Sequence, residues 1–304
     1  MTAPEVVVVG SLNMDVVARA PHLVVPGETV LGHSFVTAPG GKGANQAVAA
    51  ARLGARTAMV GRVGDDAFGA RLRAGLEADG VDVGGVGTAP GVSTGVAVIV
   101  VDDDGRNGIV VVPGANGLVT PADVDAREEA LAAARVVVLQ LEIPLATVEH
   151  AVRRARALGK TVVLNPAPAR PLPPALVACA DLLVPNEIEA AALAGAPVAS
   201  IEDAIEAGRR LRAGGAGAVL VTLGERGVVT VGPDGVRHAP APAVRAVDST
   251  AAGDTFIGGL CAALVRGRPL AAAVAFGQAA AAISVTRAGA QPSIPYLREV
   301  PVTE

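Results

Sequence analysis

The segment RVVVLQLEIPLATVEHAVRRARALGKTVVLN, residues 135–165, contains the pattern that decides the fold. It opens with an apolar run without polar alternation, which is typical of a strand buried on both faces. A helical pattern follows, with Pro144 in its first turn and Gly159 at its end, and then a second apolar run. This order predicts two parallel strands joined by a helix that covers the sheet.

The same alternation extends over most of the chain. Similar apolar runs occur at residues 6–10, 57–63, 181–185 and 218–224, with helical patterns between them. Strands that alternate with helices form a sheet of parallel strands covered on both faces. We therefore predict an α/β fold with a doubly wound, mostly parallel sheet flanked by helices.

Two segments break this rhythm because no helix follows their strand patterns. They are residues 28–37 and residues 94–112, and the second contains a polar hairpin turn at Asp104 and Gly105. An isolated small sheet is only marginally stable, so it should cover a site or pair with another copy. We predict a single domain over residues 1–304 with a small antiparallel lid, whose strands are inserted from about 13–38 and 94–112.

The composition excludes several classes of protein. The chain has 304 residues, is 51% hydrophobic and has a net charge of −4, so it lacks the basic surface that nucleic acid requires. A long uncharged stretch, residues 270–286, is alanine-rich and too short to cross a membrane. The N-terminus has no basic signal-peptide region, and Cys179 and Cys261 are expected to be reduced thiols. These features predict a cytoplasmic location.

The stretch DSTAAGDTF, residues 248–256, has the strongest chemical signal. Ala251, Ala252 and Gly253 would expose backbone amides at a helix N-terminus, where the helix dipole favours negative charge. Asp254 beside them could accept a proton from an attacking hydroxyl. Phosphoryl transfer needs mainly placement and charge stabilisation, so a base next to an anion hole suits it. The alternative is an acidic residue that only stabilises a helix end.

A second glycine-rich stretch, PGGKGANQAVAA at residues 39–50, also precedes a helix. Gly41 and Gly43 would allow close backbone approach, and Lys42 and Asn45 would point from the first turn towards a ligand. A plain turn with a solvated lysine is the alternative. Lys42 is one of only two lysines among 25 basic residues, which favours a specific role for its ammonium group.

Short polar side chains follow several of the predicted strands. Asn13 and Asp15 follow the first strand, and Glu142 and Asn165 follow two others. Each could be an ordinary turn residue. Open α/β sheets bind ligands at the carboxyl ends of their strands, and these side chains are suitable partners for sugar hydroxyls.

Two further stretches are suited to nucleotide binding. Asn186 and Glu189 have the spacing of a helix cap, and they could equally position Mg²⁺ and phosphate through water. Thr222 precedes a glycine-flanked turn that could contact the nucleotide or simply reverse the chain. The sequence has no P-loop, no dinucleotide-binding glycine fingerprint and no histidine cluster with ligand spacing.

Together these stretches resemble the PfkB-type (ribokinase-like) carbohydrate kinase family. GGKGANQAVAAARLGA is similar to its N-terminal signature and DSTAAGDTFIGG to its C-terminal one, and NPAPAR, PNEIEA, TLGERG and TRAGAQPS occur in the same order. The resemblance implies transfer of the γ-phosphate of ATP to the 5-hydroxyl of D-ribose. It further implies Mg²⁺, an activating K⁺ and a homodimer formed through the lid.

The resemblance also implies roles for individual residues. The implied ribose contacts are Asn13, Asp15, Gly41, Lys42, Gly43, Asn45 and Glu142, with Asp254 as the base and Ala251, Ala252 and Gly253 as the anion hole. The implied ATP contacts are Asn186, Thr222, Gly224, Gly227, Gly253 and Gln278, with Glu189 ordering Mg²⁺; Gln278 stands where some members place a histidine near adenine. The implied K⁺ ligands, several through backbone carbonyls, are Asp248, Thr250, Ser284, Arg287, Gly289 and Ser293.

Other functions remain open at this stage. The chain could phosphorylate another sugar or a nucleoside, although four Phe, one Tyr and no Trp offer little aromatic surface for a base. A non-catalytic sugar sensor on the same fold is a second alternative, which the intact Asp254 disfavours. A Rossmann-type nucleotide enzyme is disfavoured by the missing glycine fingerprint.

Overall fold

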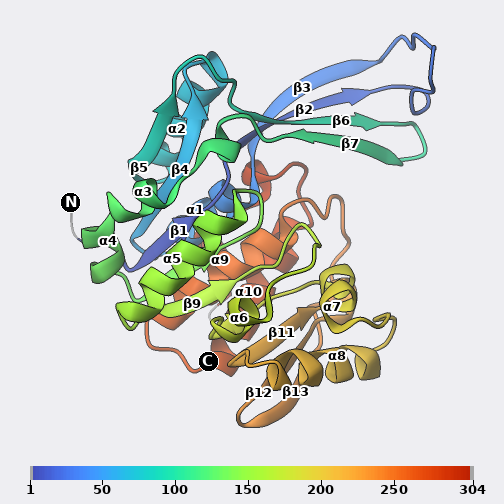
Figure 1. Cartoon of the computed structure of the whole chain (residues 1–304). Coiled ribbons are helices and arrows are strands. Elements are labelled where there is room, and N and C mark those ends of the chain that lie inside the picture. The colour runs from blue at the N-terminus through green and yellow to red at the C-terminus, as the bar shows by residue number, and fades with distance from the viewer. Residues whose placement is uncertain (1–2, 302–304) are drawn as a thin grey trace.

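A computed structural model describes residues 3–301 and is built around one large sheet (Figure 1). Neighbouring strands run parallel except at one edge, where the last two pairings are antiparallel. In spatial order they are β13 (Gly235–Ala239), β12 (Val228–Gly232), β11 (Ala218–Thr222), β10 (Leu182–Leu183), β9 (Thr161–Leu164), β8 (Val136–Leu139), β1 (Val6–Val9), β4 (Thr57–Gly64) and β5 (Asp82–Ala89). The predicted doubly wound α/β fold is confirmed.

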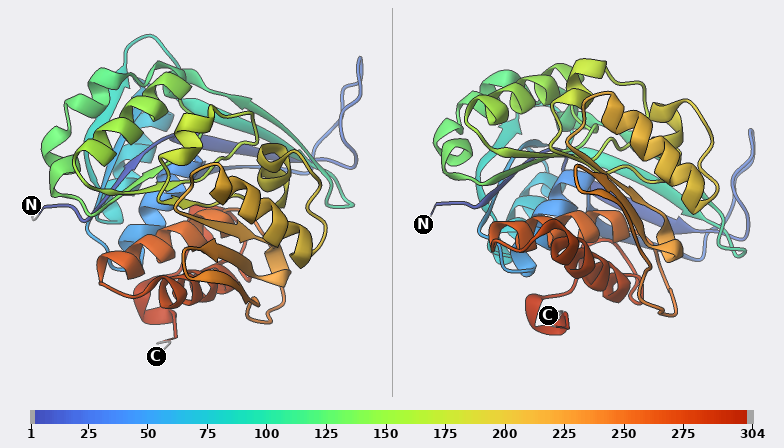
Figure 2. Two further views of the ribbon diagram at one scale, coloured as in Figure 1. Left: turned by 60° about the horizontal axis from the view of Figure 1, so that its bottom comes forward. Right: turned by 90° about the horizontal axis from the view of Figure 1, so that it is seen from below.

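Helices cover both faces of this sheet, as the view from below shows (Figure 2). One face carries α1 (Lys42–Arg52), α2 (Ala67–Ala78), α9 (Ala252–Val265) and α10 (Leu270–Ser284). The other carries α3 (Pro121–Asp125), α4 (Glu128–Ala133), α5 (Leu145–Ala157), α6 (Pro174–Ala178), α7 (Glu187–Ala194) and α8 (Ile201–Ala213). Short 3₁₀ turns lie at η1 (Gly114–Leu118), η2 (Gly224–Arg226), η3 (Gln291–Ser293) and η4 (Leu297–Glu299).

The central strand β1 explains why the apolar runs have no polar alternation. Its side chains point alternately to the two faces, and both faces are covered by helices. Val6 and Val8 belong to the core beneath α1 and α9, whereas Val7 and Val9 belong to the core beneath α5. All four valines are fully buried.

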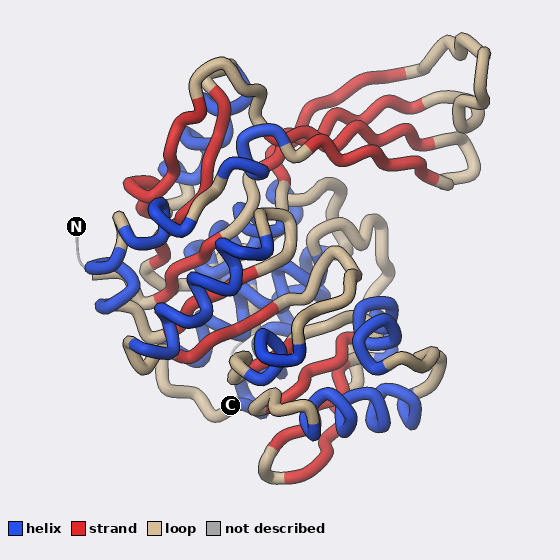
Figure 3. The backbone as a smooth tube through the Cα atoms, viewed as in Figure 1, coloured by secondary structure: helices blue, strands red, loops and turns tan. Residues whose placement is uncertain are grey.

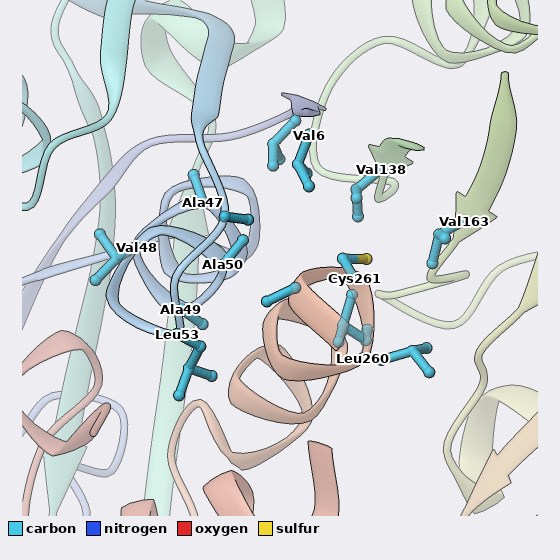
Figure 4. Close-up of a cluster of buried hydrophobic side chains, with 14 of the residues drawn as sticks. Val6, Ala47, Val48, Ala49, Ala50, Leu53, Val138, Val163, Leu260 and Cys261 are labelled. Carbon is cyan, nitrogen blue, oxygen red and sulfur yellow. The ribbon is translucent and has the colours of Figure 1, made fainter. Parts of the chain in front are cut away.

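Small residues bring α1 and α9 into close contact. Figure 4 shows α1 beside α9, with Val6, Val138 and Val163 of β1, β8 and β9 on the strand side of the same core. A Cβ atom built on Gly258 would lie 2.3 Å from the Cβ of Ala49 and 2.7 Å from the amide nitrogen of Ala50. Glycine is therefore required where the two helices meet, and this contact sets the position of the first turn of α9.

A separate four-stranded sheet projects from the main body, as the tube view shows most clearly (Figure 3). Its spatial order is β3 (Ser34–Gly40), β2 (Asn13–Arg19), β6 (Gly95–Val101) and β7 (Asn107–Val112). The hairpin predicted at Asp104 and Gly105 joins β6 to β7. The sheet is mixed rather than wholly antiparallel, because β2 and β6 run parallel.

The strand predicted over residues 28–37 begins later than expected, at Ser34. A turn at Gly27, which has a positive φ of 84°, keeps the preceding chain irregular. In this turn the Glu28 amide donates to the Val25 carbonyl, and the Glu28 carboxylate pairs with His22.

Within residues 3–301, no helix has both the length and the apolarity that a membrane span requires.

The contact at Gly258 can be tested by comparison with an open helical glycine. We expect Gly258→Ala to lower the free energy of unfolding by about 1–3 kcal/mol, because the new methyl group overpacks the α1–α9 contact. Gly75→Ala in α2 is the matched control, since nothing lies within 4 Å of its Cβ position. It should raise stability by about 0.5–1 kcal/mol. Chemical denaturation measures both, and equal stability of the two variants would contradict the close packing.

Candidate active site

A cavity of about 200 Å³ lies where the carboxyl ends of β9, β10 and β11 face the start of α9. Its position agrees with the rule that open α/β sheets bind ligands at this edge. Its lining includes eight of the predicted site residues, namely Lys42, Asn186, Glu189, Thr222, Ala251, Ala252, Gly253 and Asp254.

A larger hollow of about 470 Å³ lies beside the amino ends of β8, β9 and β10. Its two basic side chains, Arg135 and Lys160, already have hydrogen-bond partners within the protein. The guanidinium of Arg135 donates to the carbonyl of Val265 at the end of α9. The ammonium of Lys160 donates to the carbonyl of Ala132 at the end of α4. Both cations therefore neutralise helix C-termini, and the smaller cavity has the groups suited to catalysis.

The first turn of α9 presents backbone donors to the cavity. Ala251 caps the helix with a φ of 59°, and it is the single non-glycine residue with a positive φ in the described part of the chain. The amide of Ala252 donates to the carbonyl of Ser249 at 3.2 Å, so this member of the predicted anion hole has a partner. Helix geometry leaves the next amides, those of Gly253 and Asp254, without acceptors inside the helix.

Asp254 follows in the same turn and is only 8% exposed. Its Oδ2 accepts a hydrogen bond from Asn45 Nδ2 at 3.0 Å, and its Oδ1 accepts one from Gln46 Nε2 at 2.8 Å. Burial raises the pKa of Asp254 above its ordinary value, while Lys42 and the two amide donors act in the opposite direction. The carboxylate is thus a desolvated base held by two side chains of α1.

Lys42 is the cation among several acidic groups. Burial by itself lowers the pKa of Lys42, but Asp254, Glu142 and other carboxylates raise it above its ordinary value. Glu142 accepts hydrogen bonds from Ser11 Oγ at 2.5 Å and from the Lys42 amide at 3.1 Å. Burial, with Glu142 and Asp254, raises the pKa of Asp15 to about 7 against the effect of Lys42. These four predicted residues therefore share one electrostatic environment.

Glycines allow α1 to approach the chain that leaves β1. Gly41 caps α1 with a φ of 88°, and a Cβ there would lie 2.6 Å from the amide nitrogen of Asn13. A Cβ on Gly43 would lie 2.6 Å from the amide nitrogen of Ser11. The predicted close backbone approach is therefore present, and it places Lys42 and Asn45 beside Asp254.

Three of the predicted nucleotide residues, Asn186, Glu189 and Thr222, line part of the cavity, which we call the nucleotide wall. Asn186 caps α7, and its backbone and side-chain nitrogens donate to the two carboxylate oxygens of Glu189 at 2.9 and 3.0 Å. Burial raises the pKa of Glu189, opposed by the Asn186 amide and Lys42. Thr222 forms a β-bridge with Asn186. The capping interpretation is correct, and it is compatible with a ligand because the pair also lines the cavity.

Three other predicted nucleotide residues lie outside the lining of this cavity. Gly224 begins η2 and Gly227 follows it, with positive φ angles of 56° and 93°. A Cβ on Gly227 would lie 2.1 Å from the carbonyl oxygen of Ala239. Gln278 on α10 is buried and donates to that same carbonyl at 2.9 Å. Its side chain thus attaches α10 to the end of β13.

The predicted cation ligands lie on two loops joined by Asp248. Its carboxylate accepts from the amide and hydroxyl of Thr250 and from the Gly289 amide at 2.8 Å. Burial raises the pKa of Asp248, but these hydrogen bonds lower it below its ordinary value. The Ser284 and Ser293 hydroxyls donate to nearby carbonyls, and the Arg287 guanidinium pairs with Glu299.

Comparison with known proteins identifies the family to which this sequence and fold belong. Residues 3–297 match the model of the pfkB family of carbohydrate kinases. The chain belongs to this family.

Individual members of this family are similar over almost their full length. A ribokinase of Haemophilus influenzae is 42% identical over 292 residues, which cover 96% of this chain and 95% of the relative. A deoxyribokinase of Salmonella typhimurium is 38% identical over 296 residues, with 97% of each covered. An Arabidopsis thaliana ribokinase solved with ribose and ATP is 34% identical, with a TM-score of 0.91 and 98% of each chain covered.

The sequence patterns did not indicate Asn116, which contacts Asn13, one of the implied ribose-binding residues. Asn116 in η1 accepts from the Leu12 amide at 2.9 Å, which fixes the orientation of its side chain. Its Nδ2 then donates to Asn13 Oδ1 at 2.7 Å. The Nδ2 group of Asn13 is therefore left as the donor available to a ligand. A buried asparagine flanked by glycines in PGANG was the available signal.

Two glutamines near Asp254 were also missed. Gln46 lies within the alanine-rich helix α1, and Gln140 lies at the end of an otherwise apolar strand run. Both are buried, at 1% and 0% exposure. A polar side chain in an apolar stretch was the only sequence signal. It does not reveal the partner, because Gln46 and Asp254 are 208 residues apart.

The raised pKa of Asp15 gives a pH test of the sugar side. Below about pH 7 Asp15 is protonated and loses acceptor capacity, so the affinity for D-ribose, the sugar implied by the resemblance, should fall. Asp15→Asn should bind ribose weakly and remove this pH dependence. Calorimetric titration without ATP measures the affinity. Asp254→Asn is the control that keeps a dependence, moved to lower pH because Asp254 no longer raises the pKa of Asp15. A wild-type affinity that is constant between about pH 6 and pH 8 would contradict the assignment.

Proposed function

We propose that the chain is an ATP-dependent ribokinase, which transfers the γ-phosphate of ATP to the 5-hydroxyl of D-ribose and yields D-ribose 5-phosphate and ADP. One observation carries the proposal: the buried carboxylate of Asp254, held by two amides, lies beside the free backbone donors of α9 in one cavity. The similarity to ribokinases over nearly the whole chain supports it. The proposed use of ATP also suits a cytoplasmic location.

The residues would divide the chemistry as follows. Asn13, Asp15 and Glu142 bind the hydroxyls of the sugar and orient its 5-hydroxyl towards Asp254. Asp254 accepts the proton as the O–H bond breaks and the oxygen bonds to the γ-phosphorus. The bond from phosphorus to the bridging oxygen breaks, and ADP leaves. Negative charge that develops on the phosphoryl oxygens is stabilised by Lys42 and by the first-turn amides of α9.

The nucleotide wall is suited to Mg²⁺ that keeps its water ligands. The two oxygens of Glu189 already accept hydrogen bonds from Asn186, and the carboxylate still lines the cavity. Within residues 3–301, no group of three or more His, Cys, Asp or Glu side chains is placed to hold a metal ion. Mg²⁺ usually keeps several waters and takes few protein ligands. Bound with ATP, Mg²⁺ would neutralise phosphate charge. Asn186 and Glu189 would hold it through water.

The loops joined by Asp248 are suited to K⁺. Carboxylate, hydroxyl and backbone carbonyl oxygens form an all-oxygen donor set, which matches a hard cation. Arg287 would contribute only its carbonyl, because its guanidinium is paired with Glu299. Bound there, K⁺ would stabilise the loop that leads into the first turn of α9.

The small sheet supports a homodimer because both of its faces are apolar. Asp15, Val36 and Val111 belong to the face that carries the sugar-binding residues, since side chains alternate along each strand. Phe35 and Val110 belong to the opposite face and are 64% and 63% exposed. A lid covers the cavity with its first face only. A second copy of the chain is therefore the proposed cover for the other face.

The base assignment is tested by one substitution. We expect Asp254→Asn to lower kcat by at least about 100-fold while ribose still binds, because the amide cannot accept the proton. ADP release is measured with D-ribose, 2-deoxy-D-ribose, other sugars and nucleosides, each with and without K⁺. A thermal unfolding midpoint equal to that of the wild type shows that the variant has no folding defect.

Several outcomes of this assay would contradict the proposal. Near-normal turnover of Asp254→Asn would remove the base assignment. Preference of the wild type for another sugar or a nucleoside would change the substrate. Ribose binding without any turnover would favour a non-catalytic sensor.

The dimer is tested with two neighbouring valines on opposite faces of β7. We expect Val110→Glu to convert the dimer to a monomer, because it places a charge in the covered apolar face. Val111→Glu is the matched control on the same strand. It should leave the dimer intact and raise KM for ribose, because Val111 lies in the same cross-strand row as Asp15. Light scattering coupled to gel filtration measures the mass, and a monomeric wild type would contradict the proposal.

A further inference from the structure

A chain of buried amide side chains connects Asp254 to two strands of the large sheet. Gln46 Nε2 donates both to Asp254 Oδ1 at 2.8 Å and to Asn165 Oδ1 at 3.1 Å. Gln140 Nε2 donates to Gln46 Oε1 at 2.6 Å. Asn165 Nδ2 donates to the carbonyl of Val184 at 2.9 Å. The chain thus links the ends of β8 and β9 to the base on α9.

The direction of every hydrogen bond in this chain is determined by chemistry. An ionised carboxylate only accepts, so Gln46 must turn its NH₂ group towards Asp254. Its carbonyl oxygen then faces Gln140, which must present its own NH₂ group. The Val184 carbonyl likewise requires the NH₂ group of Asn165, whose oxygen is left for Gln46. A reversed Gln46 would place its oxygen against the oxygens of Asp254 and Asn165, and its NH₂ group against the NH₂ group of Gln140.

The position that Gln140 takes in this arrangement leaves one of its own polar atoms without a partner. Its Oε1 is buried without a hydrogen-bond partner. The oxygen lies against Gly10, where a Cβ atom would be 1.9 Å away. An unpartnered buried carbonyl oxygen is destabilising, so its presence indicates that Gln140 is retained for the NH₂ group that it offers to Gln46.

We propose that Gln46 is a positioning residue for the catalytic base, and that Gln140 and Asn165 lock its amide with the NH₂ group towards Asp254. This inference rests on the proposed kinase function. The locked donor fixes one carboxylate oxygen while Asn45 fixes the other. The Asp254 carboxylate is then held in one orientation in the cavity, and both donors favour its ionised form.

The lock has an electrostatic consequence at a buried base. Burial and the charge of Glu142 raise the pKa of Asp254, whereas Lys42 and the hydrogen bonds from Asn45 and Gln46 lower it. Loss of the Gln46 donor would raise that pKa. Because the base must be ionised to accept the proton, the acidic limb of the kcat–pH profile would then move to higher pH.

The test compares Gln46→Met, Gln140→Met and Thr147→Val. Methionine has a similar size and no amide, so Gln46→Met removes the donor directly and Gln140→Met removes only its lock. Thr147→Val is the control, since Thr147 is buried and its hydroxyl donates to the Val119 carbonyl at 2.7 Å, away from the site. Saturating ribose and Mg·ATP give kcat across pH, and thermal unfolding reports the fold.

We expect Gln46→Met to lower kcat by about 10–100-fold, with KM for ribose changed by less than about three-fold and the acidic limb about one pH unit higher. Gln140→Met should shift the limb in the same direction by a smaller amount, although it does not touch Asp254. Thr147→Val should lower stability without moving the limb.

The inference is overturned if both methionine variants keep the wild-type acidic limb, or if Thr147→Val moves it equally. These outcomes require a wild-type enzyme that turns over ribose, so they are distinct from failure of the proposed function. If Gln46→Met does not fold, Gln140→Met alone decides between a lock and a purely structural role.

Discussion

The close packing of α1 against α9 is the constraint on which the site depends. Gly258 allows α9 to lie against Ala49 and Ala50, so that Asp254, one turn earlier, is brought beside Asn45 and Gln46. A side chain at this crossing would separate the base from both of its donors. The alanine-rich composition of the two helices is therefore as much a feature of the site as of the core. The chemistry needs groups placed to within a fraction of an ångström, and close backbone packing supplies that precision.

Parallel strands explain why such distant residues meet at this contact. The carboxyl ends of β1, β8, β9, β10 and β11 lie along one edge of the sheet, and each contributes a polar residue just after its apolar run. The strands are buried on both faces, so polar side chains are tolerated only where the strands end. The two helices reach the same edge with their N-termini, which supply backbone donors and the positive end of the dipole. Acceptors from the strands and donors from the helices thus converge in one place.

The sequence was sufficient for the parts that depend on local pattern. The run at residues 6–10 indicated a strand buried on both faces, and the glycines around Lys42 indicated a close approach. Strand β5 has the sequence DVGGVGTA, which favours no strand, and it forms because β4 offers it a paired edge. The parallel pairing of β2 with β6 depends on the path of the whole chain and has no local signal. The role of Gln140 could not be predicted either, since its partner Gln46 is 94 residues away.

The charge of the site explains how it would discriminate between its two proposed substrates. Asp15, Glu142, Glu189 and Asp254 surround Lys42, so carboxylates outnumber the cation that they enclose. A neutral sugar is not repelled by this excess, and its hydroxyls are donors that carboxylates accept. The carboxylates repel a nucleoside triphosphate unless its negative charge is reduced, which gives a physical reason for Mg²⁺ to accompany ATP. The pKa values of Asp15, Glu189 and Asp254 are raised mainly by burial, and the neighbouring carboxylates raise them further. Lys42 opposes this excess, because its ammonium group lowers the pKa of all three carboxyl groups.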